Sequence, residues 1–163
     1  MLTIFSIPKP FKGTMDVIQR NAIKSWTLLQ PSCEIILTGD DPGTREAADE
    51  LGVRHIPALN RNEFGTPLMD HAFRLADAES KNPLLCWVNS DIILMDDILE
   101  AAKKVQKQTD WFFMTAQRTD LDWAHPLSFE KGWDDRLLRE ASRNGKLHHF
   151  TEIDFWIYPK SLL

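Results

Sequence analysis

The sequence has little that would support export, membrane insertion or binding to nucleic acid. Only two cysteines occur in 163 residues, and Cys33 and Cys86 each lie within an apolar stretch and not in a close pair. We therefore expect two buried, reduced thiols and a cytoplasmic protein. No apolar run approaches the ~20 residues of a membrane span, and no basic region followed by a long apolar one begins the chain.

Basic residues are also too few and too scattered for a nucleic-acid-binding surface. The chain has 19 lysine and arginine residues against 24 acidic ones, for a formal charge of −5, and they form no cluster. The chain therefore has no cluster of basic side chains that could neutralise the phosphates of a nucleic acid. The hydrophobic content of 43% is enough for one packed core, which makes intrinsic disorder a poor description.

Several common catalytic and nucleotide-binding motifs are absent. The sequence contains no GxxxxGK[ST], no GxGxxG and no GxSxG, so the usual triphosphatase, dinucleotide-binding and hydrolase interpretations lose their main support. His148 and His149 lie close to Glu152 and Asp154, but without HxxxH or HExxH spacing. We expect no zinc site there.

Strand-like and helix-like patterns alternate along the chain, which predicts an α/β fold. Because parallel neighbours need crossover connections, this order predicts a three-layer αβα domain over residues 1–163 with a mostly parallel central sheet. Strands are expected at 2–7, 34–38, 53–56, 84–88, 111–115 and 153–158, with the apolar run at 92–95 continuing the fourth of them. Helices are expected at about 15–30, 42–51, 67–79, 97–108 and 130–145.

The most informative polar residues follow the central apolar strand. In open α/β sheets, ligands bind beyond the carboxyl ends of the strands, and Asn89-Ser90-Asp91 occupies such a position. Alternation along an extended chain would place Asn89 and Asp91 on one side and turn Ser90 away. One carboxylate together with phosphate oxygens suffices for Mg²⁺ or Mn²⁺. The alternative is that Asp91 only caps the following turn.

Two further carboxylates and three cations are weaker candidates. Asp40 follows a predicted strand and could accept hydrogen bonds from a nucleobase or ribose, or be an ordinary turn carboxylate. Asp154 interrupts an apolar strand, where a carboxylate is costly unless it is partnered, lies at a cleft or faces outward from an edge strand. Lys9, Lys12 and Arg20 lie on or near the first loop and could meet phosphate charge or be solvated.

Taken in order, six segments of the chain resemble the GT-A glycosyltransferase-like proteins of the nucleotide-diphospho-sugar transferase superfamily, near glycosyltransferase family 2. They are TIFSIPKPF, IQRNAIKSW, EIILTGDDPGT, RNEFGTPL, LLCWVNSDIIL and EIDFWIYPK. Their most specific element is the apolar strand leading into Asn89-Ser90-Asp91, which occupies the place of that superfamily's DxD motif. Members generally continue with further elements on the acceptor side, so this chain resembles a C-terminally abbreviated member.

The resemblance implies a nucleotide-sugar donor, commonly a UDP-sugar, with its diphosphate on a divalent metal, Mn²⁺ or Mg²⁺. Asp91 matches the final residue of the motif and would be the metal ligand, whereas Asn89 departs from the acidic first position. Asn89 and Ser90 belong to the nucleotide-binding turn, and Asp40 matches a position that contacts the nucleobase or ribose.

Two other nucleotide-pocket residues and a catalytic base are also implied. Pro8 and Phe11 would border the nucleotide pocket. Asp154 lies near the place where inverting members carry a catalytic acidic residue, and is the candidate base toward an acceptor hydroxyl.

Three functions therefore remain open. The leading expectation is a metal-assisted glycosyltransferase acting on an unknown acceptor, with any activity depending on a partner subunit or a longer chain. The second is a non-catalytic GT-A-like domain that binds a nucleotide or a partner protein. The third is a nucleotidyltransferase, which usually carries a glycine-rich, basic first loop, whereas residues 8–13 supply one glycine.

Overall fold

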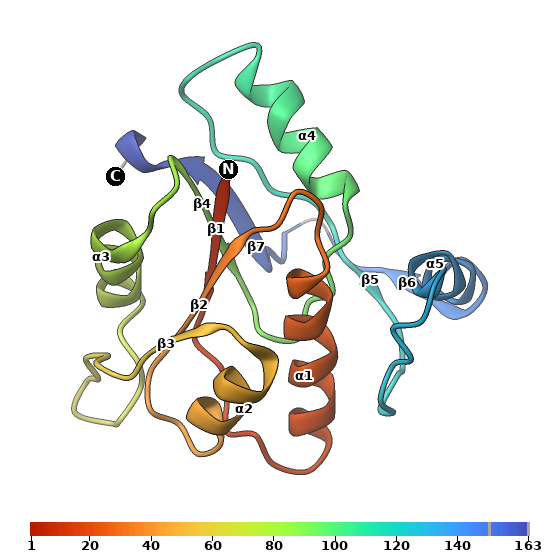
Figure 1. Ribbon diagram of the computed structural model, residues 1–163, viewed down its shortest axis with the longest axis horizontal. Coiled ribbons are helices and arrows are strands. Elements are labelled where there is room, and N and C mark those ends of the chain that lie inside the picture. The colour runs from red at the N-terminus through yellow and green to blue at the C-terminus, as the bar shows by residue number, and fades with distance from the viewer. Residues whose placement is uncertain (150, 163) are drawn as a thin grey trace.

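The computed structural model describes residues 1–149 and 151–162 and contains a five-stranded central sheet (Figure 1). The strand order is β3-β2-β1-β4-β7, in which β1 to β4 run parallel and β7 pairs antiparallel with β4. Every residue of β1 and β4 is buried, as expected for central strands covered on both faces. The strands are β1 (Leu2–Ser6), β2 (Glu34–Thr38), β3 (Arg54–Ile56), β4 (Leu84–Val88) and β7 (Phe155–Pro159).

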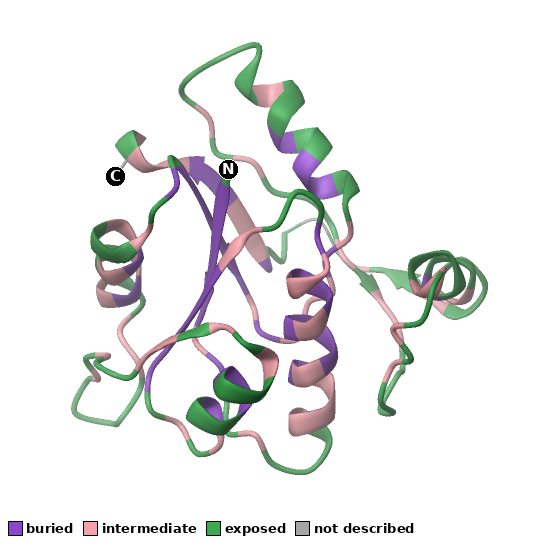
Figure 2. Cartoon of the chain, viewed as in Figure 1, coloured by how far each residue is buried: buried purple, intermediate pink, exposed green. Residues whose placement is uncertain are grey.

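Helices cover both faces of this sheet, which makes three layers. One core cluster joins one face of the strands to α1, α2 and α4, and its largest member is the fully buried Trp26 of α1. The second cluster joins the other face to α3, where Ala76 and Phe73 pack on Phe5 and Trp87. In Figure 2, these helices each combine buried stretches with partly or fully exposed ones. These helices are α1 (Thr14–Thr27), α2 (Thr44–Leu51), α3 (Met69–Glu79) and α4 (Asp97–Gln106), and a 3-10 turn covers Lys160–Leu162.

A smaller unit projects from the sheet as an arm (Figure 1). The short strands β5 (Thr119–Asp120) and β6 (Lys146–Leu147) pair antiparallel, and α5 (Trp133–Asn144) connects them. Of the residues of α5, Leu137 is buried. Asn21 of α1 fastens the connecting loop to the main body, because its side chain donates to the carbonyl of His125 and accepts from the amide of Leu127, both at 2.9 Å.

Two segments predicted to be β-strands lie outside the sheet. Residues 111–115 form a single bridge, between Met114 and Ile157 on the outer edge of β7, and Phe113 places its ring against Trp156 and Tyr158. Residues 92–95 leave the sheet because α1 holds them through side-chain hydrogen bonds described below. In both cases an apolar run packs on the core without joining the sheet, and periodicity alone does not separate these outcomes.

No helix within residues 1–149 and 151–162 has the length and hydrophobicity needed to cross a membrane.

Candidate functional site

The predicted triplet forms a turn at the carboxyl edge of the parallel strands. β7 runs antiparallel, so the segment that precedes it starts at this same edge and brings Asp154 next to Asn89. The amide of Asn89 donates to the Asp154 carbonyl, and Asn89 Nδ2 donates to Asp154 Oδ1, both at 2.9 Å. This pairing orients the Asn89 amide, and its Oδ1 makes no hydrogen bond with any residue in the described part of the chain.

Asp154 is a buried carboxylate held by two donors. It is 7% exposed, and Asn89 bonds one of its oxygens while Arg118 Nη1 lies 2.5 Å from the other. Arg118 precedes β5, so this ion pair also fastens the arm to the sheet. Both oxygens of this buried carboxylate therefore have a donor, one from a neutral amide and one from a guanidinium.

His148 is held between two carboxylates beside this pair. Its Nδ1 lies 2.5 Å from Asp120 and its Nε2 lies 2.5 Å from Glu152, and Arg118 Nη2 lies close to both ring nitrogens. Hydrogen bonds with Asp120 and then Glu152 raise the pKa of His148. Hydrogen bonds from Arg118 and then His148 lower the pKa of Asp120. These contacts thus favour the charged forms of His148 and Asp120.

Asp91 differs from these carboxylates because its side chain has no hydrogen bond or ion pair with any residue among 1–149 and 151–162. It is half-buried at the end of the turn. The described residues contain no group of three or more His, Cys, Asp or Glu side chains placed to hold a metal. The donors available here, the Asp91 carboxylate and Asn89 Oδ1, fit a hard cation that takes its remaining oxygens from phosphate and water. The metal role of Asp91 stays a prediction.

Asp40 lies at the same edge, beyond β2, and has an arginine partner. Its side chain is 70% exposed, and Arg61 Nη2 lies 3.2 Å from it and 2.7 Å from Asp41. Both acids line a shallow cavity of about 230 Å³ that also includes His55 and Pro57. To bind a nucleobase or ribose as predicted, Asp40 would have to do so while it stays paired with Arg61, or would have to give up its ion pair with Arg61.

Pro8 and Phe11 lie in the loop that connects β1 to α1. Pro8 is buried, and Phe11 packs against the α1 face of the core with the Arg20 guanidinium 5.7 Å from its ring centre. The Phe11 amide donates to the Pro42 carbonyl at 2.8 Å, and any Cβ at Gly43 would lie 2.6 Å from the Phe11 Cβ. Gly43 is therefore needed for this close approach between the loops after β1 and β2. The place of Pro8 and Phe11 beside a nucleotide stays a prediction.

Two residues that matter for this edge were not predicted from the sequence. Arg118 lies between the strand predicted at 111–115 and the helix predicted at about 130–145, and nothing in its local sequence indicates a partner 36 residues away. Gln19 is fully buried in α1 and bonds both Lys9 and Ser90. A signal for Gln19 does exist, because it precedes Trp26 by seven residues and therefore lies on the buried side of the helix.

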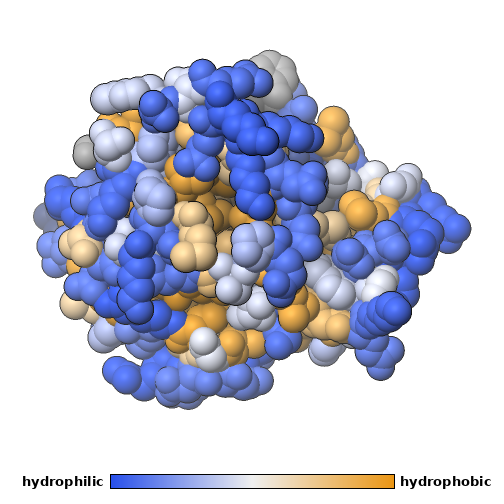
Figure 3. Space-filling model, turned by 45° about the horizontal axis from the view of Figure 1, so that its top comes forward, coloured by the Kyte–Doolittle hydropathy of each residue, from blue (hydrophilic) through white to orange (hydrophobic). Residues whose placement is uncertain are grey.

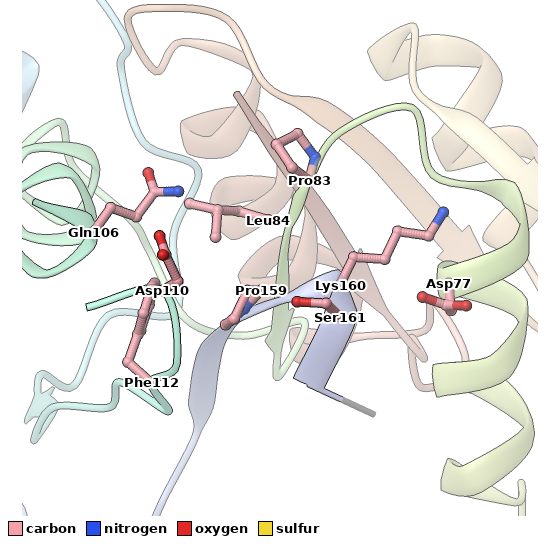
Figure 4. Close-up of a pocket in the computed structure, with 9 residues that line it drawn as sticks. All are labelled: Asp77, Pro83, Leu84, Gln106, Asp110, Phe112, Pro159, Lys160 and Ser161. Carbon is pink, nitrogen blue, oxygen red and sulfur yellow. The ribbon is translucent and has the colours of Figure 1, made fainter.

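A larger hollow lies at the opposite, amino edge of the sheet. It measures about 580 Å³, and Figure 4 shows its lining residues around the start of β4 and the end of β7. Figure 3, which turns this edge toward the viewer, shows hydrophobic side chains exposed in the middle of the face and ringed by hydrophilic ones. None of the predicted site residues lines this hollow, and neither cavity is lined by Asn89 or Asp91.

Comparison with known proteins identifies the fold and leaves the family open. No protein-family model matches the sequence, and no curated protein matches it either. Among solved structures, CMP:2-keto-3-deoxy-manno-octonic acid synthetase complexed with CTP is similar, with a TM-score of 0.55 and 11% identity over 99% of this chain and 76% of that one. The fold is similar to that of this synthetase. The predicted class, an α/β domain with a mostly parallel central sheet flanked by helices, is thereby confirmed.

A second solved structure is less similar. The bifunctional IspDF from Campylobacter jejuni matches with a TM-score of 0.49 and 10% identity, over 99% of this chain and 41% of that one. At such identities the likeness concerns the fold only, because one fold supports many functions.

Proposed function

We propose that this chain is a nucleotide-binding domain that transfers a nucleotidyl group from a nucleoside triphosphate to an oxygen of an acceptor. The observation that carries the proposal is the turn at residues 89–91. Neighbouring elements hold Asn89 and Ser90 by hydrogen bonds, while the Asp91 carboxylate has no partner among the described residues. The likeness to a synthetase complexed with CTP, over 99% of this chain, supports a nucleoside triphosphate as the ligand.

The proposed reaction exchanges one phosphoryl bond for another. An acceptor oxygen attacks the α-phosphorus and forms the new O–P bond, the bond between the α-phosphorus and the bridging oxygen breaks, and pyrophosphate leaves with that electron pair. The proton of the acceptor passes to solvent or a nearby base. A divalent cation, when bound, neutralises charge on the leaving pyrophosphate. Asp91 would hold it, and Asn89 Oδ1 is the second oxygen available.

Glycosyl transfer from a nucleotide sugar is the second candidate, favoured by the place of Asp154 directly beside Asn89. In that reaction Asp154 would act as the base toward an acceptor hydroxyl. In the structure, however, both carboxylate oxygens already have donors, one from Asn89 and one from Arg118. For Asp154 to take the proton of the acceptor, Arg118 would first have to move away from the oxygen that it now contacts.

The test measures binding and product with the same preparation. Thermal unfolding is followed with CTP, UTP, ATP, GTP and UDP-glucose, each with and without Mn²⁺. A ligand at a hundred times its Kd stabilises the folded state by about 2.7 kcal/mol, which corresponds to a rise of about 5–10 °C in Tm. We expect at least one triphosphate to give a Mn²⁺-dependent rise of this size. If no nucleotide raises the Tm, the proposal is rejected.

Variants and products then separate the candidates. Asp91→Ala should abolish the Mn²⁺-dependent part of the rise, whereas the control Asp49→Ala, an exposed carboxylate on α2, should keep it. Pyrophosphate release from a triphosphate in the presence of sugar-acid or alcohol acceptors supports nucleotidyl transfer. Release of UDP from UDP-glucose, lost in Asp154→Asn, would instead support glycosyl transfer.

A further inference from the structure

Gln19 connects two loops at the carboxyl edge that are far apart in the sequence. It lies in α1 and is fully buried. Its Oε1 accepts from the Lys9 amide and from Ser90 Oγ, both at 2.7 Å, and its Nε2 donates to the Lys9 carbonyl at 2.9 Å. The Gln19 side-chain amide therefore bonds the backbone N–H and C=O of Lys9, which follows β1. It also bonds Ser90, the middle residue of the turn that follows β4.

This arrangement changes the role that the sequence suggests for Ser90. Ser90 is 6% exposed and its hydroxyl donates to Gln19 inside the protein, so the hydroxyl is not presented to a ligand. Oε1 of Gln19 has two acceptor directions, and Lys9 and Ser90 take both. Loss of the Ser90 hydroxyl therefore leaves the Gln19 amide with its two hydrogen bonds to the Lys9 backbone.

The residue after Asp91 is anchored to the same helix. Trp26 Nε1 donates to the Ile92 carbonyl at 2.8 Å, and Ser25 Oγ accepts from the Leu94 amide at 3.1 Å. Ser90 and Ile92 are thus both tied to α1, and Asp91 lies between them with a side chain that has no partner in the described part of the chain. The backbone on each side of Asp91 is fixed, and its carboxylate is not used to fix it.

We propose that Gln19 is a positioning residue that couples the loop after β1 to the turn that carries Asp91. Through the Ser90 hydroxyl it sets where the Asp91 carboxylate stands relative to the Lys9 backbone, and so sets how well a cation on Asp91 and a nucleotide at the first loop are held together. The binding part of this inference rests on the proposed nucleotide function; the coupling of the two loops does not.

The first experiment needs no ligand. The Lys9 amide has Gln19 Oε1 as its acceptor, so its hydrogen exchange, measured by NMR, reports on the Gln19 amide. Ser90→Ala removes one donor to Gln19 and leaves Lys9 itself unaltered. If the loops are coupled, exchange at Lys9 should become roughly threefold to tenfold faster in Ser90→Ala, the effect of about one hydrogen bond. In Gln19→Ala it should become faster still.

A matched control separates coupling from general loss of stability. Asn82 is also a buried polar residue, and its Nδ2 donates to the Leu2 carbonyl and to Thr3 Oγ1 at the opposite edge of the same sheet. Asn82→Ala should lower the Tm at least as much as Ser90→Ala and leave Lys9 exchange unchanged at a temperature well below unfolding. Unchanged Lys9 exchange in Ser90→Ala, or equal acceleration in Asn82→Ala, overturns the proposal.

The second experiment measures CTP affinity by calorimetry with and without Mn²⁺. Ser90→Ala should weaken the Mn²⁺-dependent affinity about threefold to tenfold and change the metal-free affinity less than twofold, whereas Asn82→Ala should change neither. Equal losses with and without Mn²⁺ would contradict the positioning role. If the wild-type chain binds no nucleotide, the proposed function fails at that step, and Lys9 exchange alone then decides whether the coupling stands.

Discussion

Replacing Arg118 with methionine tests how strongly the carboxyl edge depends on one ion pair. The substitution keeps much of the side-chain length and removes the guanidinium that lies 2.5 Å from Asp154. Asp154, 7% exposed, would keep Asn89 as its remaining donor. Removing one partner of a fully buried pair costs about 3–5 kcal/mol. Because the Arg118 side chain is 27% exposed, we expect about 2–3 kcal/mol from this contact.

The other contacts of Arg118 add little. Its remaining carboxylate partners, Asp120 at 2.6 Å and Glu152 at 3.8 Å, are 43% and 59% exposed, and exposed pairs contribute at most about 1 kcal/mol. The total loss should therefore be about 3 kcal/mol, or roughly 6–12 °C in Tm. Urea unfolding at pH 7, followed by circular dichroism, measures it.

The same substitution made in the Asp154→Asn variant identifies the cause of this loss of stability. In Asp154→Asn the carboxylate charge is absent, so the further change Arg118→Met should cost only about 1 kcal/mol. The control Arg74→Met removes an exposed helical pair with Asp70 and should cost about 0.3 kcal/mol. A loss below about 1 kcal/mol for Arg118→Met, or the same loss in both backgrounds, would refute the reasoning that a buried Asp154 needs this partner.

Three further outcomes are expected. The pKa of His148 is raised in the folded state, so the stabilising contribution of His148 should be complete below pH about 6.5 and should disappear as the pH rises through the folded-state pKa. The difference in urea midpoint between wild type and His148→Gln should therefore become smaller as the pH rises. A difference that stays constant with pH would contradict this. Asp40→Ala should weaken nucleotide binding roughly threefold to tenfold without altering its Mn²⁺ dependence, and calorimetry that finds no loss rejects that role. Of the two thiols predicted to be buried, Cys86 is buried and Cys33 is partly buried. Burial raises the pKa of Cys33 to about 11 and that of Cys86 further, so both thiols should react slowly with a disulfide reagent at pH 8 and rapidly in urea. A fast reaction of the native protein would contradict this.

Local sequence patterns predicted most of the elements and the fold class. The apolar runs at Leu2–Ser6, Glu34–Thr38 and Leu84–Val88 became sheet strands because they are long enough to be strands and lie between turn signals. Periodicity does not encode strand direction, so the antiparallel pairing of β7 could not be predicted from it. The strand predicted at residues 111–115 is wrong because an apolar run that packs on the edge of β7 has the same hydrophobic pattern as a strand within the sheet.

The carboxyl-edge positions of Asn89, Asp91 and Asp40 could also be predicted, because the residues that follow parallel strands collect at one edge of the sheet. Their partners could not. Asp154 bonds Asn89 across 65 residues, Gln19 bonds Ser90 across 71, and Arg61 bonds Asp40 across 21. No periodicity links such positions.

Most strands and helices, and the residues that lie at the carboxyl edge, can thus be predicted from the sequence, since they follow from local hydrophobic spacing and from connections between neighbouring elements. Which carboxylates are neutralised depends instead on how distant elements pack. Asp154 and Asp40 acquire arginine partners, whereas Asp91 acquires none among residues 1–149 and 151–162. An ion pair forms over a few ångströms of space, and the packing of distant elements sets those distances.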